Sequence, residues 1–164
     1  MINFQQKMSE AISVSATDKR SKYEELFPQL VSLIGSESDT IANMANLCAA
    51  LKDTFNFLWV GFYIVKVDQL VLGPFQGPIA CTRIGFGKGV CGTAWKNGKT
   101  LVVPDVNAFP GHIACSSLSK SEIVVPVINN EKVIAVLDVD SDQEAFFNEI
   151  DAQYLEKIVR LLKF

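Results

Sequence analysis

The hydrophobic period of this chain changes at Phe57, and that change limits the folds that the chain can adopt. Before it, apolar residues recur every three or four positions over Lys22 to Ile34 and again over Ile41 to Phe55, which is typical of amphipathic helices. After it, Leu58 to Val65 is rich in aromatic and β-branched residues and has a period of two, as in a strand. The pattern predicts two helices followed by a sheet.

The first helix should end at Gly35, and Ser38 or Asp39 should cap the second. Residues 1–20 are polar and Ser-rich without a clear period, so we expect a loosely held arm before a domain that spans residues 21–164. Six side chains are expected to line the buried face of the second helix: Ile41, Met44, Ala45, Cys48, Leu51 and Phe55. Cys48 is therefore interpreted as a structural residue of the helix-sheet core.

The rest of the chain alternates short strands with two further helices. Gly73-Pro74 interrupts one strand, which indicates either a bulge or an edge position. The remaining elements are predicted at Leu70–Phe75, Ile79–Ile84, a helix over Val90–Lys96, Thr100–Val103, a hairpin of Ser121–Ile128 with Lys132–Val139, and a closing helix over Phe146–Leu162.

These elements predict one α+β domain, with a central antiparallel sheet, helices packed on one side and a loop-covered pocket on the other. A chain of 164 residues, 49% of them hydrophobic, can bury one continuous core. Trp59, Gly61 and Tyr63 project from the sheet face opposite Val60 and Phe62. Two aromatic side chains beside a glycine could form a pocket wall or pack against another element, and the sequence leaves both open.

The charge pattern gives no indication of a polyanionic partner. The net charge is -3, without a Lys/Arg run or basic stripe, so we expect neither nucleic acid nor an anionic membrane surface as a ligand. The N-terminus lacks a signal sequence, and no apolar run reaches the roughly 18 residues of a spanning helix, so a cytoplasmic protein is expected. In that compartment, clustered cysteines serve as metal ligands, redox groups or core residues rather than as structural disulfides.

A loop that carries a potentially reactive thiol precedes the predicted hairpin. Pro110 fixes φ and Gly111 tolerates positive φ, so His112 and Cys115 should lie on a loop. A lone cysteine would more often be a small buried residue, but further cysteines are available as partners. The glycine-rich run over residues 85–92 lacks both the dinucleotide spacing and the Gly-Lys-Ser/Thr ending, so nucleotide binding is rejected.

Three carboxylates are expected near this loop. Asp138 and Asp140 are two positions apart and so share one face of a strand, while Glu122 enters the neighbouring strand. A lone Asp pair is more often a solvated strand end, but with Glu122 a buried cluster is favoured. Like charges raise each other's pKa, which makes a proton donor plausible near neutral pH, although the same charges oppose ionisation of the Cys115 thiol.

The convergence of these carboxylates depends on the hairpin connection. A tight turn at Asn129-Asn130 would pair Ile128 with Glu131 and set Glu122 opposite Leu137, on the wrong face. A three-residue connection or a β-bulge is therefore predicted.

Several short motifs lie within residues 72–141 of the chain. They are Leu72-Gly-Pro-Phe-Gln-Gly77, Ala80-Cys81, Gly89-Val-Cys-Gly92, Phe109-Pro-Gly-His-Ile-Ala-Cys115, Ser121-Glu-Ile-Val124 and Leu137-Asp-Val-Asp-Ser141. Together they closely resemble the motifs of the free methionine-(R)-sulfoxide reductases, a branch of the GAF-domain fold. The resemblance covers roughly residue 20 to the end, and its three-cysteine pattern is specific, since sensory GAF domains generally lack it. Ser116 departs from the family, which usually has Asp directly after the loop cysteine.

The resemblance implies a single GAF-like domain and a thiol mechanism. Cys115 would attack the sulfur of free methionine-(R)-sulfoxide, releasing methionine and leaving a sulfenic acid. Cys81 would resolve it as a disulfide, with Cys91 as the alternative resolving thiol. Thioredoxin, which receives its electrons from NADPH, would then reduce the disulfide. No bound cofactor is implied. The chemistry itself needs a thiolate, a second thiol and a proton source, all of which the chain contains.

The resemblance also assigns the binding residues. Glu122, Asp138 and Asp140 are implied to hold the substrate ammonium, with Glu122 and Asp140 as candidates for the carboxyl that keeps a proton. Trp59 and Tyr63 are implied to surround the methyl-thio end.

Two other functions compete with this interpretation. One is a sensory GAF module that binds a small regulator without chemistry, which would be expected to carry a fused output domain. The other is a zinc site of Cys81, Cys91, Cys115 and His112, but the cysteine spacings of 10 and 24 residues contain no Cys-x-x-Cys knuckle, so no metal is expected. The sequence leaves the assembly open, a homodimer included.

Overall fold

The computed structural model describes residues 11–113 and 115–164, which form an α+β domain around one six-stranded antiparallel sheet of order β3-β2-β1-β6-β5-β4. Residues 1–10 of the expected arm and Ala114 of the cysteine loop lie outside the described residues. The elements are α1 (Lys19–Gly35), α2 (Thr40–Phe55), β1 (Trp59–Lys66), β2 (Gln69–Gln76), β3 (Arg83–Gly85), α3 (Gly89–Asn97), β4 (Leu101–Val103), the short 3-10 helix η1 (Val106–Ala108), β5 (Ser121–Asn129), β6 (Lys132–Ser141) and α4 (Glu149–Val159).

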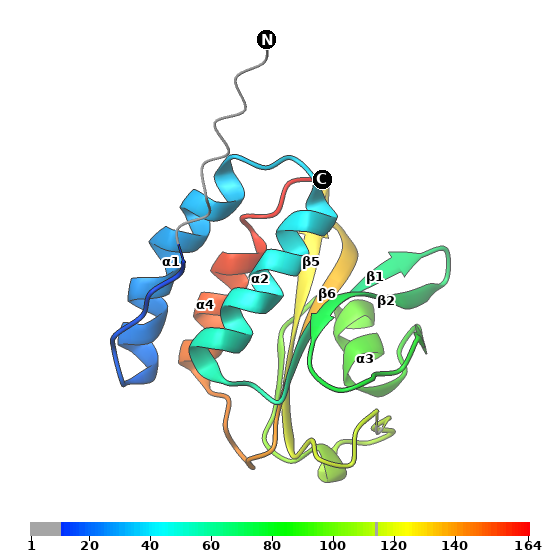
Figure 1. The fold of residues 1–164 in the computed structure, drawn as a ribbon. Helices are drawn as coiled ribbons and strands as arrows, with labels where there is room; N and C mark the ends of the chain where they lie inside the picture. Colours follow the sequence, from blue (N-terminus) through cyan, green and yellow to red (C-terminus); the bar gives the residue numbers. More distant parts are fainter. Residues whose placement is uncertain (1–10, 114) are drawn as a thin grey trace.

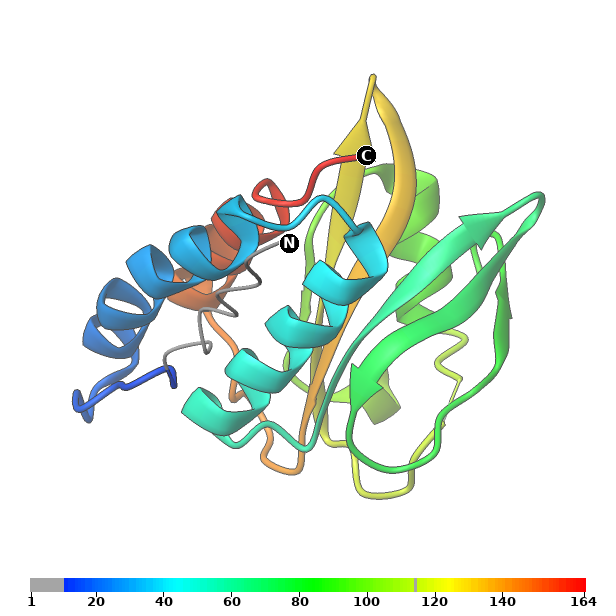
Figure 2. The ribbon, with the colours of Figure 1, turned by 45° about the horizontal axis from the view of Figure 1, so that its top comes forward.

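The helices lie on both faces of the sheet. Helices α2 and α4 pack on one face and α1 covers them, whereas α3 lies on the opposite face (Figures 1 and 2). The larger core cluster joins the three covering helices to β1, β5 and β6, and a second cluster joins α3 to the other face of the same strands. The expectation of helices on one side therefore holds for α1, α2 and α4, while the short helix α3 shares the pocket side. No helix in residues 11–113 or 115–164 is long and apolar enough to cross a membrane.

Aspartate side chains cap the first two helices. Asp18 accepts a hydrogen bond from the Ser21 N–H at 3.0 Å, and Asp39 accepts one from the Ala42 N–H at 2.8 Å. The first helix consequently begins three residues before the predicted Lys22.

The face of α2 that packs on the sheet differs from the prediction. Ile41 is 52% exposed and Ala45 is exposed, while Asn43 and Leu47 are buried. The apolar pattern could not reveal a buried asparagine, whose amide here donates to the Glu37 carbonyl at 3.0 Å. Cys48 is buried as predicted, and burial raises the pKa of its thiol to about 12, which makes it unreactive.

The predicted irregularity in β2 is a bulge. Gly61 pairs with Phe75 and Tyr63 pairs with Leu72, so two residues of β2 stand opposite Phe62 alone. On its other side β2 pairs with β3 only over Gln69–Val71, so among the described residues Gly73-Pro74 also lies at an edge position of the sheet.

The strand expected over Ile79–Ile84 is too long, because only Arg83–Gly85 pairs with β2. In the connection before β3, backbone carbonyls accept hydrogen bonds from side chains of β1 rather than from a neighbouring strand. The Trp59 indole N–H donates to the Pro78 carbonyl at 3.1 Å, and the Tyr63 hydroxyl donates to the Cys81 carbonyl at 3.0 Å. Cys81 therefore lies on a connection held above the sheet, not in a strand.

The hairpin contains the bulge that the carboxylates require. Its turn is at Asn130-Glu131, both with positive φ, one position later than predicted. Ile128 pairs with Val133 but Val127 pairs with Ala135, which leaves Ile134 as the extra residue. Without that residue, Glu122 would stand opposite Val139; with it, Glu122 pairs with Asp140 and shares its face.

A buried ion pair that the sequence did not reveal joins α1 to α4. Asp151 is fully buried and accepts from Lys19 Nζ at 2.5 Å, from the Tyr23 hydroxyl at 3.0 Å and from the Asn148 N–H at 2.8 Å. Asn148 in turn caps α4, so one carboxylate fixes both the start of α4 and its contact with α1.

Asp151→Ala is expected to lower the free energy of unfolding by about 3–5 kcal/mol, because it leaves the Lys19 ammonium and the Tyr23 hydroxyl without their buried partner. Urea denaturation followed by circular dichroism measures this loss. Asp53→Ala, at an exposed position of α2, is the control and should change the value by no more than about 0.5 kcal/mol. A loss below about 1 kcal/mol for Asp151→Ala would contradict this account.

Candidate active site

The strand register collects the candidate site residues on the sheet face that carries α3. Asp140 of β6 pairs with Trp59 of β1 on one side and with Glu122 of β5 on the other. In the adjacent row, Asp138 pairs with Gly61. Two neighbouring rows of the sheet therefore supply three carboxylates and the start of an aromatic wall.

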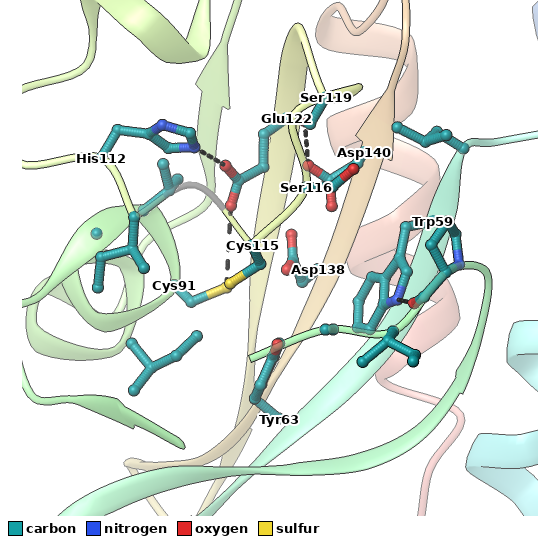
Figure 3. A pocket seen from close by; sticks show the side chains of 18 of the residues that line it. Trp59, Tyr63, Cys91, His112, Cys115, Ser116, Ser119, Glu122, Asp138 and Asp140 are labelled. Carbon is teal, nitrogen blue, oxygen red and sulfur yellow. Dashed lines mark hydrogen bonds and ion pairs between the residues drawn. The ribbon is translucent and has the colours of Figure 1, made fainter. Parts of the chain in front are cut away.

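A pocket of about 590 Å³, its open mouth included, lies over these rows. Its floor is the sheet, and its walls are the first turn of α3, the connection before β3 and the loop before β5 (Figure 3). Cys91, Cys115, Trp59 and Tyr63 line it together with the three carboxylates. The structure thus brings seven of the eight predicted site residues to one cavity, and the eighth, Cys81, is bonded to its rim.

Cys81 and Cys115 form a disulfide across a separation of 34 residues, with their Cα atoms 5.4 Å apart. This value lies within the roughly 7 Å that the expected pairing requires. Both cysteines are half-buried, whereas the two free cysteines of the described chain, Cys48 and Cys91, are buried on opposite faces of the sheet. The disulfide joins the connection before β3 to the loop before β5.

Cys91 lies in the first turn of α3, beneath the mouth of the pocket. Its thiol donates to Glu122 Oε1, with sulfur and oxygen 3.9 Å apart. Burial, and then the charges of Asp138 and Glu122, raise the pKa of this thiol well above its ordinary value. Cys91 is therefore a neutral thiol at neutral pH in this state of the protein.

The three carboxylates are crowded and short of partners. Glu122 and Asp138 are only 6% and 7% exposed, and Asp138 Oδ1 is buried without a hydrogen-bond partner among the described residues. Asp140 accepts a hydrogen bond from the Ser119 hydroxyl. The carboxylate oxygens point into one shared space in Figure 3.

Burial is the main reason that the pKa of each carboxyl is raised, and the charges of neighbouring carboxylates raise the pKa of Glu122 and Asp138 further. The pKa of Asp140 is raised to about 6, while those of Glu122 and Asp138 lie well above their ordinary values. The cluster consequently holds at least one proton near neutral pH, and a ligand cation would relieve its repulsion.

His112 reaches the cluster from the loop. Its Nε2 lies 3.9 Å from Glu122 Oε2, and burial lowers the pKa of the imidazole. A neutral imidazole at this place can accept or pass on a proton, but it contributes no fixed positive charge near Cys115.

Trp59, Gly61 and Tyr63 form the wall on the β1 side. The two aromatic rings have centroids 5.9 Å apart. A Cβ at Gly61 would come within 2.4 Å of Trp59 Cη2, so the glycine lets the indole lie flat on the strand. The pocket-wall interpretation of these residues is thus the one that the geometry favours.

The zinc set considered from the sequence is not assembled, because the disulfide occupies two of its four ligands, Cys81 and Cys115. A different trio, Cys91, Glu122 and Asp138, has ligand atoms that all lie within 4.8 Å of one another. These groups could hold a cation, although the two carboxyls and the thiol all favour their protonated forms.

Sequence reasoning missed two parts of the pocket. One is Ser119, which holds Asp140 and was only one of several serines before the strand. The other is the first turn of α3, where Lys88, Gly89 and Val90 line the cavity. The glycine-rich run is the signal for the latter, but the sequence assigned only Cys91 of that turn to the site, as the alternative resolving thiol.

Comparison with known proteins gives a consistent result. The family model of the GAF domain matches residues 37–164. GAF domain-containing protein A of Dictyostelium discoideum is 59% identical over 156 residues, covering 94% of this chain and 99% of that protein. The free methionine-R-sulfoxide reductase of Saccharomyces cerevisiae is 40% identical over 157 residues, covering 90% and 87% respectively.

A solved structure agrees with the fold over nearly the whole chain. The X-ray structure of the free methionine-R-sulfoxide reductase from Neisseria meningitidis, in complex with its substrate, superposes with a TM-score of 0.91 at 54% identity. The match covers 92% of each chain.

Proposed function

From the premise that this chain belongs to the GAF domain family and, within it, to the free methionine-R-sulfoxide reductases, we propose that it reduces free L-methionine-(R)-sulfoxide to L-methionine through a cysteine sulfenic acid and an intramolecular disulfide. The observation that carries the proposal is the Cys81–Cys115 disulfide at the mouth of a pocket floored by three carboxylates. A sensory module would gain nothing from redox-active thiols beside its ligand, so this alternative is set aside.

The first step uses the loop cysteine as nucleophile. The Cys115 thiolate attacks the sulfoxide sulfur and forms a transient sulfur–sulfur bond. The oxygen takes up a proton and transfers to the Cys115 sulfur, so that the substrate sulfur–oxygen bond and the transient sulfur–sulfur bond both break and Cys115 is left as a sulfenic acid. Methionine leaves, so the substrate sulfur has gained two electrons and the cysteine sulfur has lost two. Glu122 and Asp140 are the proposed proton donors, since the raised pKa of each keeps a proton available near neutral pH.

The second step closes the disulfide. The Cys81 thiol attacks the sulfenic sulfur of Cys115, and the hydroxyl leaves as water once protonated. We prefer Cys81 to Cys91 as the resolving thiol, because the buried and crowded position of Cys91 raises its pKa and so lowers its thiolate fraction. A dithiol protein of the thioredoxin type, reduced by NADPH, would then return two electrons to the disulfide.

Substrate binding follows from the chemistry of the pocket. The ammonium group would lie among Glu122, Asp138 and Asp140, where Asp138 Oδ1 has no other partner within the described residues. The substrate carboxylate would lie at the start of α3, because a helix N-terminus favours an anion. Trp59 and Tyr63 would then pack against the methyl-thio end.

The proposal requires a reducing compartment, which fits the cytoplasm, and it requires no second subunit. Every proposed site residue comes from the one chain, so a homodimer would not be needed to complete the pocket.

The free amino acid, and only its R epimer, is expected to be a good substrate, because an N-acylated residue has no ammonium for the carboxylate cluster. NADPH oxidation coupled to thioredoxin and its reductase should be observed with free methionine-(R)-sulfoxide. Turnover should be at least about 30-fold slower with N-acetylmethionine-(R)-sulfoxide, since truncating one partner of a buried charge pair costs about 2–5 kcal/mol. The separated S epimer, whose sulfoxide oxygen points the other way when the ammonium is bound, should give no turnover. Comparable rates with the N-acetyl compound or an oxidised protein would overturn the proposed substrate.

A further inference from the structure

The surface around the disulfide is unusually apolar. Among the described residues, Ile79 is 92% exposed, Leu118 is 58% exposed and Ile113 is 40% exposed. Ile79 and Ile113 each lie two residues before a cysteine of the disulfide, and Leu118 lies three residues after Cys115. We call these three side chains the apolar collar.

The collar surrounds the disulfide in space as well as in sequence. The two cysteines have Cα atoms 5.4 Å apart, and two residues of chain reach at most about 7 Å. Ile79 and Ile113 both line the mouth of the pocket, and the Leu118 N–H turns back to the Ser116 hydroxyl at 3.2 Å. Exposed apolar side chains gathered at one place mark a surface that another molecule covers.

The two chain segments that carry the collar contain cations and no anions. Segments 76–89 and 109–120, which contain the collar and both cysteines, carry Arg83, Lys88 and Lys120 and no Asp or Glu. All three cationic residues are exposed. The whole chain has a net charge of -3, so the rest of it, without these three cations, has -6. A positive rim on a negatively charged protein orients an acidic partner to this face.

The redox chemistry requires a close approach at the same place. To reduce the disulfide, a partner thiolate must attack the sulfur of Cys81 or Cys115 and form a mixed disulfide while the other cysteine leaves as a thiolate. The partner's second thiol then displaces the enzyme cysteine, so the enzyme gains two electrons and the partner becomes a disulfide. Any protein that brings its cysteine to bonding distance must also cover the collar.

We propose that the apolar collar and its cationic rim, Arg83, Lys88 and Lys120, are the docking surface for an acidic dithiol protein that reduces Cys81–Cys115. This inference rests on the proposed function and names the surface by which the oxidised enzyme is recycled. A small dithiol such as dithiothreitol needs no such surface, which separates docking from chemistry.

Leu118→Ser is expected to lower kcat/KM for an acidic thioredoxin about 10-fold, which is the loss typical of truncating one important apolar side chain in a protein interface. Turnover driven by dithiothreitol, and KM for the sulfoxide, should stay as in the wild type. The matched control is Ile41→Ser, because Ile41 is 52% exposed but lies on α2, on the other side of the sheet. It should leave both assays unchanged.

Lys120→Glu tests the rim, with Lys132→Glu as its control at the far end of the β5–β6 hairpin (Figure 2). Thioredoxin-driven kcat/KM should fall about 5-fold or more in Lys120→Glu, and the wild-type value should fall with rising salt more steeply than that of the variant.

Three outcomes would overturn the docking surface: unchanged thioredoxin-driven rates in both test variants, equal losses with dithiothreitol, or equal losses in the controls. Failure of the proposed function is a different result, since wild-type enzyme would then release no methionine even with dithiothreitol.

Discussion

Replacing Cys115 with serine is expected to abolish methionine release even within a single turnover. A serine hydroxyl is a far weaker nucleophile toward sulfoxide sulfur than a thiolate, so the first bond never forms. The nearby Cys91 should not substitute for it, because burial and the charges of Asp138 and Glu122 raise the pKa of that thiol. Methionine per enzyme, measured by chromatography after mixing excess sulfoxide with prereduced protein, gives the result directly.

Cys81→Ser should behave differently, because the nucleophile is intact and only the resolving thiol is lost. We expect about one methionine per enzyme, followed by a stalled sulfenic acid that mass spectrometry detects after trapping with dimedone. A slow second phase would report resolution by Cys91. Cys48→Ala is the control, since Cys48 lies in the core on the opposite face of the sheet and should leave turnover unchanged.

The assignment of Cys115 as the nucleophile has clear failing results. Single-turnover release that survives in Cys115→Ser would contradict it. So would a peptide map of the oxidised wild type in which Cys48 is crosslinked, because Cys48 and the Cys81–Cys115 pair are separated by the sheet.

The periodic features of the fold could be predicted from the sequence, because periodicity reports burial directly. The period-two run after Phe57 placed Trp59 and Tyr63 on the face opposite Val60 and Phe62, as the two core clusters confirm. The spacing of Asp138 and Asp140 placed both on one face. Because a regular two-residue turn would set Glu122 on the opposite face, the sequence also predicted an irregular hairpin.

The features that the sequence did not reveal depend on contacts between distant segments. The turn at Asn130-Glu131 puts Glu131 at positive φ, a conformation that a glutamate does not itself favour. Asp151 contacts Lys19 and Tyr23, which lie more than 120 positions away in the sequence, so no local sequence pattern predicts this cluster. The strand predicted through Cys81 does not form there: the Tyr63 hydroxyl binds the Cys81 carbonyl, and the Trp59 indole binds the Pro78 carbonyl just before the predicted strand.

The hairpin bulge links fold to function. Ile134 is one unpaired residue far from the pocket, yet it shifts the pairing by one position and turns Glu122 to the face of Asp140. The register thereby places three carboxyl groups side by side in a buried site. Such an arrangement is unfavourable for the fold, and it makes sense where a cationic ligand group completes the cluster.

Asp138→Asn is accordingly expected to weaken catalysis and strengthen the fold. Loss of one buried charge partner for the substrate ammonium should lower kcat/KM about 100-fold, which corresponds to about 3 kcal/mol. The folded-state pKa of Asp138 is raised, mainly by burial, so between about pH 4 and that raised pKa the folded protein binds more protons than the unfolded chain. The stability of the wild type therefore falls as pH rises through this window, and the variant escapes that loss.

Thermal unfolding at two pH values tests the sign of this effect. At pH 8 the variant should be more stable than the wild type by about 1–3 kcal/mol, or several degrees in Tm, whereas at pH 4 the difference should nearly vanish. Asp142→Asn, at an exposed position two residues beyond Asp140, is the control and should change neither kcat/KM nor Tm at either pH. If Asp138→Asn lowered Tm at pH 8 while keeping full activity, the carboxylate would be a structural hydrogen-bonding group, and its proposed role with the substrate ammonium would have to be abandoned.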